Sequence, residues 1–390
     1  MKIFVIHARR TGYGVIRALH TYTDEIYVAD SHKTAVFSSR HVKQGFVCSD
    51  ITTVSDEAFL EEVIELAHQM DYQKERPVVF TGKDDYLQFF SKYSDVLSKY
   101  FLLSFESDYA KLNKALSKLD LIDIANQAKV KIPLSWSSKT NLSEILSQVT
   151  YPAIIKPAVK NAPEIDVVKQ AFRIKVCEKE KDLREAAGLL ESLSVPYVVQ
   201  EYIPGDDSEL FTIGVYSWRG ELKAWSTSQK IRQFPPSTGE CSYGRTLHLE
   251  ALVEPARRIL KAIGLTGISQ IEFKYHRGEY YLIEINPRVW SWHQIHTKVG
   301  VNLAKVAMDC IYGQVNDHLI EPRKEERFWM FLMMDLLHNR LLNRNLSWVQ
   351  LCVNFLRSDL EAFFSWKDPM PFIIHTWQTI PYIKQQLKNG

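Results

Sequence analysis

The chain has 390 residues, of which 46% are hydrophobic, 24% charged and 12% aromatic, a balance typical of a soluble globular protein. At about 100–200 residues per domain, this length predicts two or three domains. The 48 Lys and Arg residues nearly balance the 46 Asp and Glu residues and leave a formal charge of +2, so no global basic field indicates nucleic-acid binding.

Cysteine usage and the first residues of the chain bear on its compartment. The five cysteines are scattered and form no C-x-x-C pair, which argues against a disulfide framework and a structural zinc site. The opening run MKIFVIHARRTG does not read as a secretory signal, because Arg9 and Arg10 interrupt a short apolar stretch. No apolar stretch approaches the roughly 20 residues that span a bilayer. We therefore expect a cytoplasmic protein.

The first hundred residues alternate predicted strands and helices. The strands are the apolar runs at 2–7, 25–29 and 77–81, and the helices begin near residue 15 and at residue 57. This alternation predicts a parallel sheet with crossover helices. Gly12 and Gly14 suggest a dinucleotide motif, but Arg17 replaces its third glycine, so a tight turn that starts a helix explains them better.

The pattern changes from about residue 109, where strands joined by hairpin turns begin to dominate. Gly220 and Gly278 mark two of these turns. Helices are predicted at 111–127, 182–193 and 302–311, and strands at 151–157, 172–176, 197–200, 210–218, 221–228, 269–275 and 279–285.

The most informative stretch is SQIEFKYHRGEYYLIEINPR, residues 269–288. An antiparallel hairpin here would bring Glu272 close to Glu284, and Asn286 would share the face of Glu284 because it lies two residues further on. Two carboxylates and an amide oxygen suit Mg²⁺. The alternative is an ion pair with Lys274 or Arg288 on a solvated face, which explains Glu284 poorly, because this carboxylate lies within the apolar run YLIEI.

Two lysines are candidates for contact with phosphate groups. The predicted strand YPAIIKP carries Lys156 in an apolar context, and an ammonium group on a flexible side chain suits phosphate oxygens. Lys114 lies in the predicted helix 111–127, where a phosphate contact and a surface ion pair explain it equally well.

Four motifs in chain order resemble those of the ATP-grasp superfamily. They are the segment at Lys114, the YPAIIKP strand, the run VVQEYIPG at 198–205 and the hairpin EFK…YLIEINPR. The resemblance covers about residues 114–311 and implies ATP and Mg²⁺ as ligands, with Mn²⁺ as an alternative metal. It further implies a hinge at which Gln200, Glu201 and Ile203 line the adenine.

The resemblance implies an α/β fold of the ATP-grasp type (α+β) in four parts. They are an N-terminal parallel-sheet domain at 1–108, a small or lid subdomain with its preceding helix at 109–200, a subdomain with the metal site at 201–320 and a mainly helical extension at 321–390.

Charged residues near these motifs complete the predicted site. An acidic side chain after the hinge would bind the ribose hydroxyls, and both Asp207 and Glu209 are candidates. Lys230 and Arg232 would hold the γ-phosphate or an acceptor carboxylate, the alternative being a solvated loop stiffened by two prolines. Arg288 would stabilise charge on the transferring phosphoryl group.

The sequence departs from the family after Lys156, where a Gly-rich lid is replaced by AVKNAPEIDVVKQ, residues 158–170. We expect the phosphates to be covered by a loop that closes with Lys160 or Lys169, or by a segment that orders with substrate. The run WSWHQIH at 290–296 resembles the subset of ATP-grasp proteins similar to D-aspartate ligase and to capsule- or glycan-associated carboxylate–amine ligases, in which it lies beside the acceptor pocket.

The resemblance implies an ADP-producing ligase that joins a small-molecule carboxylate to an amine through an acyl phosphate. Amino acids, peptides and glycan-linked carboxylates are the implied substrates, with a cell-wall or capsule precursor among them. One alternative, an ATP-dependent carboxylation or carbamoylation enzyme, ranks lower because the sequence shows no second ATP-grasp half and no biotin-carrier motif. The other, a non-catalytic nucleotide-binding module, would not need to retain Glu272, Glu284, Asn286 and Arg288.

The tail is rich in Trp, Phe and Leu, as in FWMFLMMDLLHNRLLNRNLSWVQLCVNFL at 328–356. Such a segment fits either a membrane-surface helix or two amphipathic helices packed on the core. We expect the packed arrangement, because surface binders usually carry a dense Lys and Arg face.

Overall fold

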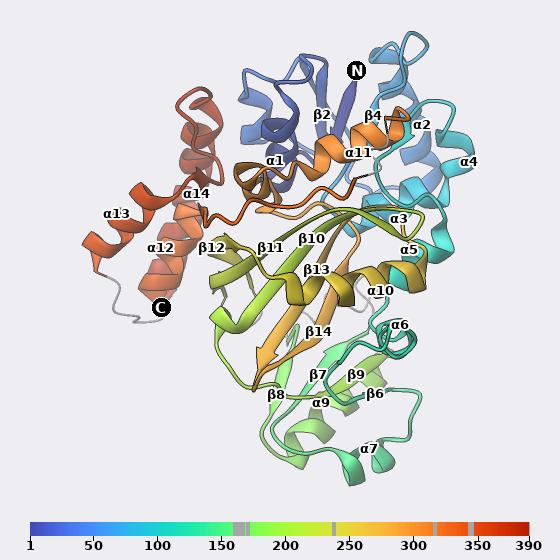
Figure 1. Cartoon of the computed structure of the whole chain (residues 1–390), viewed down its shortest axis with the longest axis vertical. Helices are drawn as coiled ribbons and strands as arrows, with labels where there is room; N and C mark the ends of the chain where they lie inside the picture. The colour runs from blue at the N-terminus through green and yellow to red at the C-terminus, as the bar shows by residue number, and fades with distance from the viewer. Residues whose placement is uncertain (159–167, 169–171, 236–238, 315–317, 342–346, 390) are drawn as a thin grey trace.

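The structure, a computed structural model, describes residues 1–158, 168, 172–235, 239–314, 318–341 and 347–389. Three sheets, of five, four and seven strands, form its framework (Figure 1). No helix among the described residues is long and apolar enough to cross a bilayer.

The first domain contains the predicted parallel sheet, with strand order β3-β2-β1-β4-β5. Its strands are β1 Ile3–Ile6, β2 Ile26–Asp30, β3 Gln44–Val47, β4 Val78–Phe80 and β5 Leu102–Leu103. Its helices are α1 Arg10–Leu19, η1 Ala35–Ser38, α2 Asp56–Gln69, α3 Asp84–Lys92 and α4 Ser94–Leu97.

The glycines at 12 and 14 do not form the expected turn, because α1 already begins at Arg10 and includes both of them. A Cβ on Gly14 would lie 2.7 Å from the His293 ring. The absent side chain therefore lets α1 approach a segment far along the chain.

A four-stranded sheet of order β6-β9-β7-β8 forms the small subdomain. It contains β6 Ser135–Ser137, β7 Ala153–Pro157, β8 Lys175–Cys177 and β9 Tyr197–Glu201, with the helices α7 Leu142–Gln148 and α9 Glu180–Ser192. The single helix expected at 111–127 is two helices, α5 Tyr109–Leu116 and α6 Asp120–Ala128. The break follows from Ser117, whose backbone is extended.

The large sheet has seven strands in the order β14-β13-β10-β11-β12-β15-β16. They are β10 Leu210–Trp218, β11 Glu221–Phe234, β12 Glu240–Leu247, β13 Gly267–His276, β14 Glu279–Asn286, β15 Phe328–Met330 and β16 Leu360–Glu361. The helical segments around it are η2 Asp207–Glu209, η3 Glu250–Leu252, α10 Val253–Ile263, η4 His293–Val299 and α11 Leu303–Ile311.

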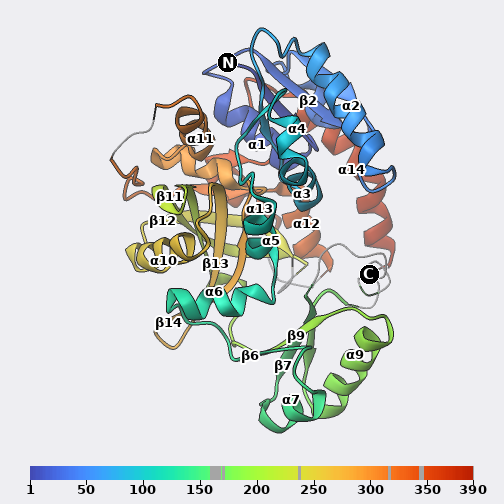
Figure 2. The same cartoon turned by 90° about the vertical axis from the view of Figure 1, so that its right-hand side faces the viewer.

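The two faces of the large sheet pack against different partners. One face shares a hydrophobic cluster with α6 and α10. The other shares a cluster with α1, α11 and the tryptophans at 290 and 292, and Figures 1 and 2 show the first domain on that side. This second cluster joins the large sheet to the first domain.

The tail folds onto the core, as the sequence predicts. Besides the helices α12 Leu332–Leu341, α13 Trp348–Arg357 and α14 Met370–Asn389, it contributes two strands that the sequence did not predict. Strand β15 pairs antiparallel with β12, and β16 pairs with β15. The tail therefore supplies the outer edge of the large sheet.

Candidate functional site

The β13–β14 hairpin brings four oxygen-bearing side chains together. Glu272 lies opposite Glu284 in the strand register, and Gln270 lies opposite Asn286. Side chains two residues apart share a face of a strand, so all four lie on one face. A register irregularity directly after Glu272 is of the kind that bends a strand and re-aims a side chain. The proximity predicted from sequence is confirmed.

The buried side chain of Lys230 forms an ion pair with Glu272 of this hairpin. The Lys230 Nζ lies 3.0 Å from one Glu272 carboxylate oxygen and 3.2 Å from the other, and Gln270 donates a hydrogen bond of 2.7 Å to the same carboxylate. Burial alone would lower the pKa of Lys230, but Glu272 and Glu284 outweigh it and hold the pKa above its usual value. The partner of Glu272 is thus Lys230, not the Lys274 considered above, which donates to the carbonyls of Gly205 and Asp206.

Arg288 connects the hairpin to the first domain. Its Nε lies 2.6 Å from a carboxylate oxygen of Asp84, in the first turn of α3. Burial opposes its charge, but Asp84, Glu284 and Glu272 raise the pKa of Arg288. Sequence reasoning missed Asp84 because it lies 204 residues from Arg288 and carries no local signal.

Arg232 differs from Lys230 and Arg288, since it is held by the tail. Its Nε and Nη2 donate to the two carboxylate oxygens of Asp335 at 2.7 and 2.9 Å, and Ser242 donates a third hydrogen bond to Asp335. Asp335 is fully buried. This geometry favours an architectural role for Arg232, and its predicted contact with phosphate or acceptor stays a prediction.

The small sheet presents Lys156 and Gln200 on a common face. Lys156 pairs with Val198 and Ile154 pairs with Gln200 in the β7–β9 register, while the alternate residues Ile155 and Val199 belong to the cluster that packs under α9. Lys156 and Gln200 therefore lie on the face turned away from that cluster. Gln200 is oriented by a hydrogen bond from its Nε2 to Ser135 Oγ at 2.8 Å.

The two acidic candidates after β9, Asp207 and Glu209, have different surroundings. Asp207 is buried and accepts hydrogen bonds from the backbone and side-chain nitrogens of Gln233 at 3.2 and 2.9 Å. Glu209 is partly exposed, and its carboxylate has no hydrogen-bond partner among the described residues. The geometry favours Glu209 for a ligand hydroxyl. Ile203 is buried beside the hinge, and Glu201 accepts from the backbone N–H of Leu134.

Lys114 lies on α5, which packs against β14. The neighbouring Lys118, which the sequence analysis did not select, donates to the carbonyl oxygen of Pro157 at 3.0 Å. It thereby ties the α5–α6 turn to the end of the strand that carries Lys156. The predicted phosphate cover with Lys160 and Lys169 lies outside the described residues.

The family model described as ATP-grasp in the biosynthetic pathway with Ter operon matches residues 194–329. D-aspartate ligase of Enterococcus faecium (strain Aus0004) is 25% identical over 277 residues, which cover 66% of this chain and 65% of that protein. Residues 194–329 therefore form part of an ATP-grasp domain. The chain spans just under two thirds of that relative's length.

Solved structures show that the ATP-grasp fold extends over most of this protein. L-amino acid ligase from Bacillus licheniformis superposes with a TM-score of 0.59 at 16% identity, over 81% of this chain and 77% of that chain. N5-carboxyaminoimidazole synthetase from Staphylococcus aureus, complexed with ADP, superposes with a TM-score of 0.63 at 12% identity, over 88% of this chain and 84% of that chain.

The hairpin of this ATP-grasp protein has the chemistry of a magnesium site. The candidate donors are the carboxylates of Glu272 and Glu284 and the amide oxygen of Asn286, and among the described residues no group of three or more His, Cys, Asp or Glu side chains is placed to hold a metal. Mg²⁺ typically takes one or two carboxylates and completes its shell with water and phosphate oxygens. Lys230 already shows that a cation is accommodated beside Glu272. The residues therefore fit Mg²⁺.

The WSWH run packs as part of the core. Trp290 lies against Gly214 and Trp292 against Gly244, where a Cβ would crowd each indole ring. His293 and His296 are also buried. The glycines let the run lie flat on the large sheet, close to Gln270, which is opposite Gly214. Nothing in this packing supports the expected contact with an acceptor.

We expect these two histidines to make the ATP-grasp protein sensitive to acid. Burial lowers the pKa of His293 to about 4 and that of His296 to about 3, from an ordinary value of 6.5. Between pH 6.5 and 4 the unfolded chain therefore binds more protons, so the free energy of unfolding falls as the pH falls. Acidification from pH 7 to pH 5 is therefore expected to lower the free energy of unfolding by up to about 2 kcal/mol for each histidine.

Urea unfolding at pH 7 and pH 5 tests this expectation on the wild type and a His296→Gln variant. Carboxylates titrate equally in both proteins, so the variant should lose less stability on acidification. An identical loss in the two proteins would show that His296 is not held neutral.

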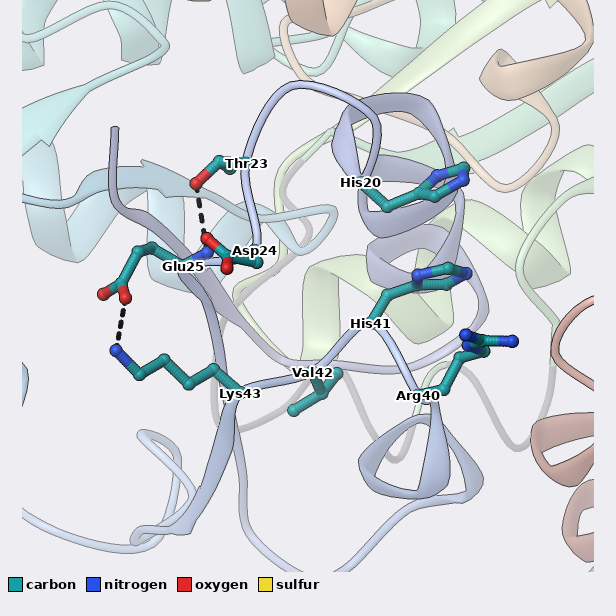
Figure 3. Close-up of a pocket in the computed structure, with 8 residues that line it drawn as sticks. All are labelled: His20, Thr23, Asp24, Glu25, Arg40, His41, Val42 and Lys43. Carbon is teal, nitrogen blue, oxygen red and sulfur yellow. Dashed lines mark hydrogen bonds and ion pairs between the residues drawn. The ribbon is translucent and has the colours of Figure 1, made fainter.

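A separate pocket of about 330 Å³ lies on the first domain (Figure 3). His20 and His41 contact each other with ring centroids 4.1 Å apart, and Glu25 is paired with Lys43. The pocket lies at the amino ends of β2 and β3, whereas ligands of parallel sheets bind at the carboxyl ends. Asp84 follows the carboxyl end of β4, so this pocket is not part of the candidate site.

Proposed function

We propose that this ATP-grasp protein is an ATP-dependent ligase that joins a carboxylate to an amine. The observation that carries the proposal is a group of five residues: Glu272, Glu284 and Asn286 on the β13–β14 hairpin, Arg288 just after it, and Lys230 on β11, which reaches Glu272 past the intervening strand β10. Two acidic side chains, an amide, the buried cation of Lys230 and the partly buried cation of Arg288 suit a metal ion and phosphate groups better than a hydrophobic or redox ligand. Figures 1 and 2 place the small sheet beside the end of this hairpin.

The substrate carboxylate would attack the γ-phosphorus of ATP, forming an acyl phosphate and releasing ADP. The amine would then attack the acyl carbon, giving the amide as phosphate leaves and the amine nitrogen loses a proton. Glu272, Glu284 and Asn286 would hold Mg²⁺, which neutralises phosphate charge when bound. Lys230 and Arg288 would stabilise negative charge on the transferring phosphoryl group, since fixed cations in a buried site need little reorganisation.

The nucleotide would lie between the small sheet and the hairpin. Lys156 would contact its phosphates, Gln200, Glu201 and Ile203 would line the base, and Glu209 would accept from the ribose hydroxyls. Lys114 remains a second candidate for a phosphate contact. The strand faces support this arrangement for Lys156 and Gln200, and the other assignments are those that the resemblance to the ATP-grasp family implies.

Amino acids or short peptides are the substrates that we propose. The support is the sequence similarity to D-aspartate ligase and the fold shared with L-amino acid ligase. A cell-wall or capsule precursor as the acceptor remains a prediction.

Release of ADP from MgATP tests the proposed activity, with amino acids offered singly and in pairs as carboxylate and amine donors. The expected result is ADP release, with formation of an amide product, only when a carboxylate and an amine are both present. ADP release that depends on bicarbonate would indicate a carboxylation enzyme instead. ATP binding without turnover across the whole panel would indicate a nucleotide-binding module.

Replacing Lys156 by Ala is expected to raise the apparent KM for ATP by about tenfold to a hundredfold, because a charge-assisted hydrogen bond contributes ~1.5–3 kcal/mol. The matched control is Lys175→Ala on the adjacent strand β8. Lys175 lies opposite Ile155 and thus on the other face, so its replacement should leave KM unchanged. Equal values for the two variants would contradict a phosphate contact by Lys156.

A further inference from the structure

The tail exposes most of the large hydrophobic side chains that face solvent. Nine of the sixteen such side chains among the described residues lie between residues 348 and 380. We define the tail surface by these nine residues: Trp348, Val349, Val353, Leu356, Trp366, Met370, Ile373, Trp377 and Ile380. Trp366 is 89% exposed and Trp377 79%. Single exposed hydrophobic residues are ordinary, but such a concentration marks an interaction surface.

The exposed residues follow helical spacing on two helices. On α13, Trp348, Val349, Val353 and Leu356 lie on the outer side, while Leu351 is buried. On α14, the exposed positions 370, 373, 377 and 380 are separated by three, four and three residues. A surface helix normally turns its apolar stripe toward the core. Here both helices present one outward.

Aromatic contacts join the two helices into one unit. Phe364 lies between them, with its ring centroid 5.9 Å from Phe355 of α13 and 5.4 Å from Phe372 of α14. Trp366 packs on the same ring at 4.8 Å. These ring contacts therefore fix the two helices that form the tail surface relative to each other.

The exposed charges around the tail surface have one sign, because its acidic residues are buried or paired. Its segment has three acidic residues, Asp359, Glu361 and Asp368. Glu361 and Asp368 are buried and accept hydrogen bonds from backbone or hydroxyl groups of the core, and Asp359 is paired with Arg327.

The two basic residues of the same segment are available at the surface, since Arg357 and Lys367 are exposed. Among the described charged side chains of residues 348–380, those that are exposed are therefore both positive.

We propose that the tail surface binds the surface of an anionic lipid bilayer. Tryptophan favours the interface between headgroups and acyl chains, and the two exposed basic residues add attraction to anionic headgroups. The exposed aromatic side chains, which the sequence alone did not place at the surface, therefore carry the proposal in place of a dense basic face. A second copy of the chain fits less well, because a two-fold interface joins the same surface of both copies and, within the described residues 348–380, this surface offers no exposed acidic residue to pair with Arg357 and Lys367. Figure 1 shows α13 at the edge of the molecule, away from the small sheet, so binding leaves the candidate site accessible. The proposal does not depend on the ligase activity.

Flotation of the full-length protein with vesicles tests the proposal. Co-flotation is expected with mixed phosphatidylglycerol and phosphatidylcholine vesicles, and much less with phosphatidylcholine alone. The double variant Trp366→Ser/Trp377→Ser should lower partitioning at least about tenfold, since two large apolar side chains no longer insert. Arg357→Glu/Lys367→Glu should weaken binding to the anionic vesicles alone.

The matched control is Leu134→Ser, which removes an exposed hydrophobic side chain, 65% exposed, from the region before β6. It should float as the wild type does, and all variants should keep the wild-type melting temperature. Absence of co-flotation, or equal loss in the control, would overturn the proposal. So would a concentration-dependent dimer that the tryptophan variant abolishes while vesicle binding stays absent.

Discussion

Replacing Glu284 by Gln is expected to lower the rate of ADP release at least about a hundredfold at saturating Mg²⁺, because a metal-bound carboxylate that neutralises the transferring phosphoryl group contributes several kcal/mol. Glutamine keeps the shape of the side chain but removes its charge. Glu284 lies opposite Glu272 and adds to the field that raises the pKa of Lys230, so the variant weakens the site for both the metal and the lysine. Asn286→Ala should have a similar effect on turnover.

The control for this measurement is Glu279→Gln at the start of the same strand. Glu279 is exposed and paired only with the exposed Lys131 among the described residues, so its replacement should leave turnover within about twofold. Unfolding curves of both variants should match the wild type. Near wild-type turnover of Glu284→Gln would refute the metal assignment, and ATP titration would then show whether the nucleotide site remains.

Replacing Asp335 by Asn is expected to lower the free energy of unfolding by about 3–5 kcal/mol, the usual cost of removing one partner from a buried ion pair. Asp335 is fully buried and accepts both hydrogen bonds of the Arg232 fork. Its removal leaves a guanidinium without its counter-charge between β11 and α12. Urea unfolding of the whole chain measures the difference.

A matched surface pair provides the comparison. Glu326 is paired with Arg245 at 3.0 Å, but its side chain is 53% exposed, and exposed pairs contribute only ~0–1 kcal/mol. Glu326→Gln should therefore have little effect. A loss of less than about 1 kcal/mol for Asp335→Asn would show that the tail does not depend on this pair.

Much of the candidate site could be predicted from local patterns in the sequence. The hairpin could be predicted because alternation along a strand has a period of two, and Gly278 marks its turn. This places Glu272 against Glu284 with no knowledge of the rest of the fold. The strand with Lys156 was recognisable for the same reason, since a lysine between apolar neighbours stands out within a short buried run. The α/β alternation of the first domain likewise predicts its parallel sheet.

Other features could not be predicted because no local period connects the residues involved. The helix expected at 111–127 breaks at Ser117, where the extended backbone lets Lys118 reach the carbonyl oxygen of Pro157. The strands β15 and β16 have few residues and form only because β12 offers them an unpaired edge. The glycines of α1 suggest a turn in the sequence, yet both lie within the helix, and Gly14 makes room for His293.

The sequence by itself therefore determined which side chains can meet within one strand pair, and thus the pair of carboxylates. Only the tertiary structure decided which residues form ion pairs with the charged side chains in and around the site. Lys230 reaches Glu272 across 42 residues, Arg232 reaches Asp335 across 103, and Arg288 reaches Asp84 across 204. A buried charge requires a partner of opposite sign, but that requirement does not say which of the chain's many charges supplies it. Packing of the large sheet against the first domain and the tail selects those partners, because it removes the other charges from reach.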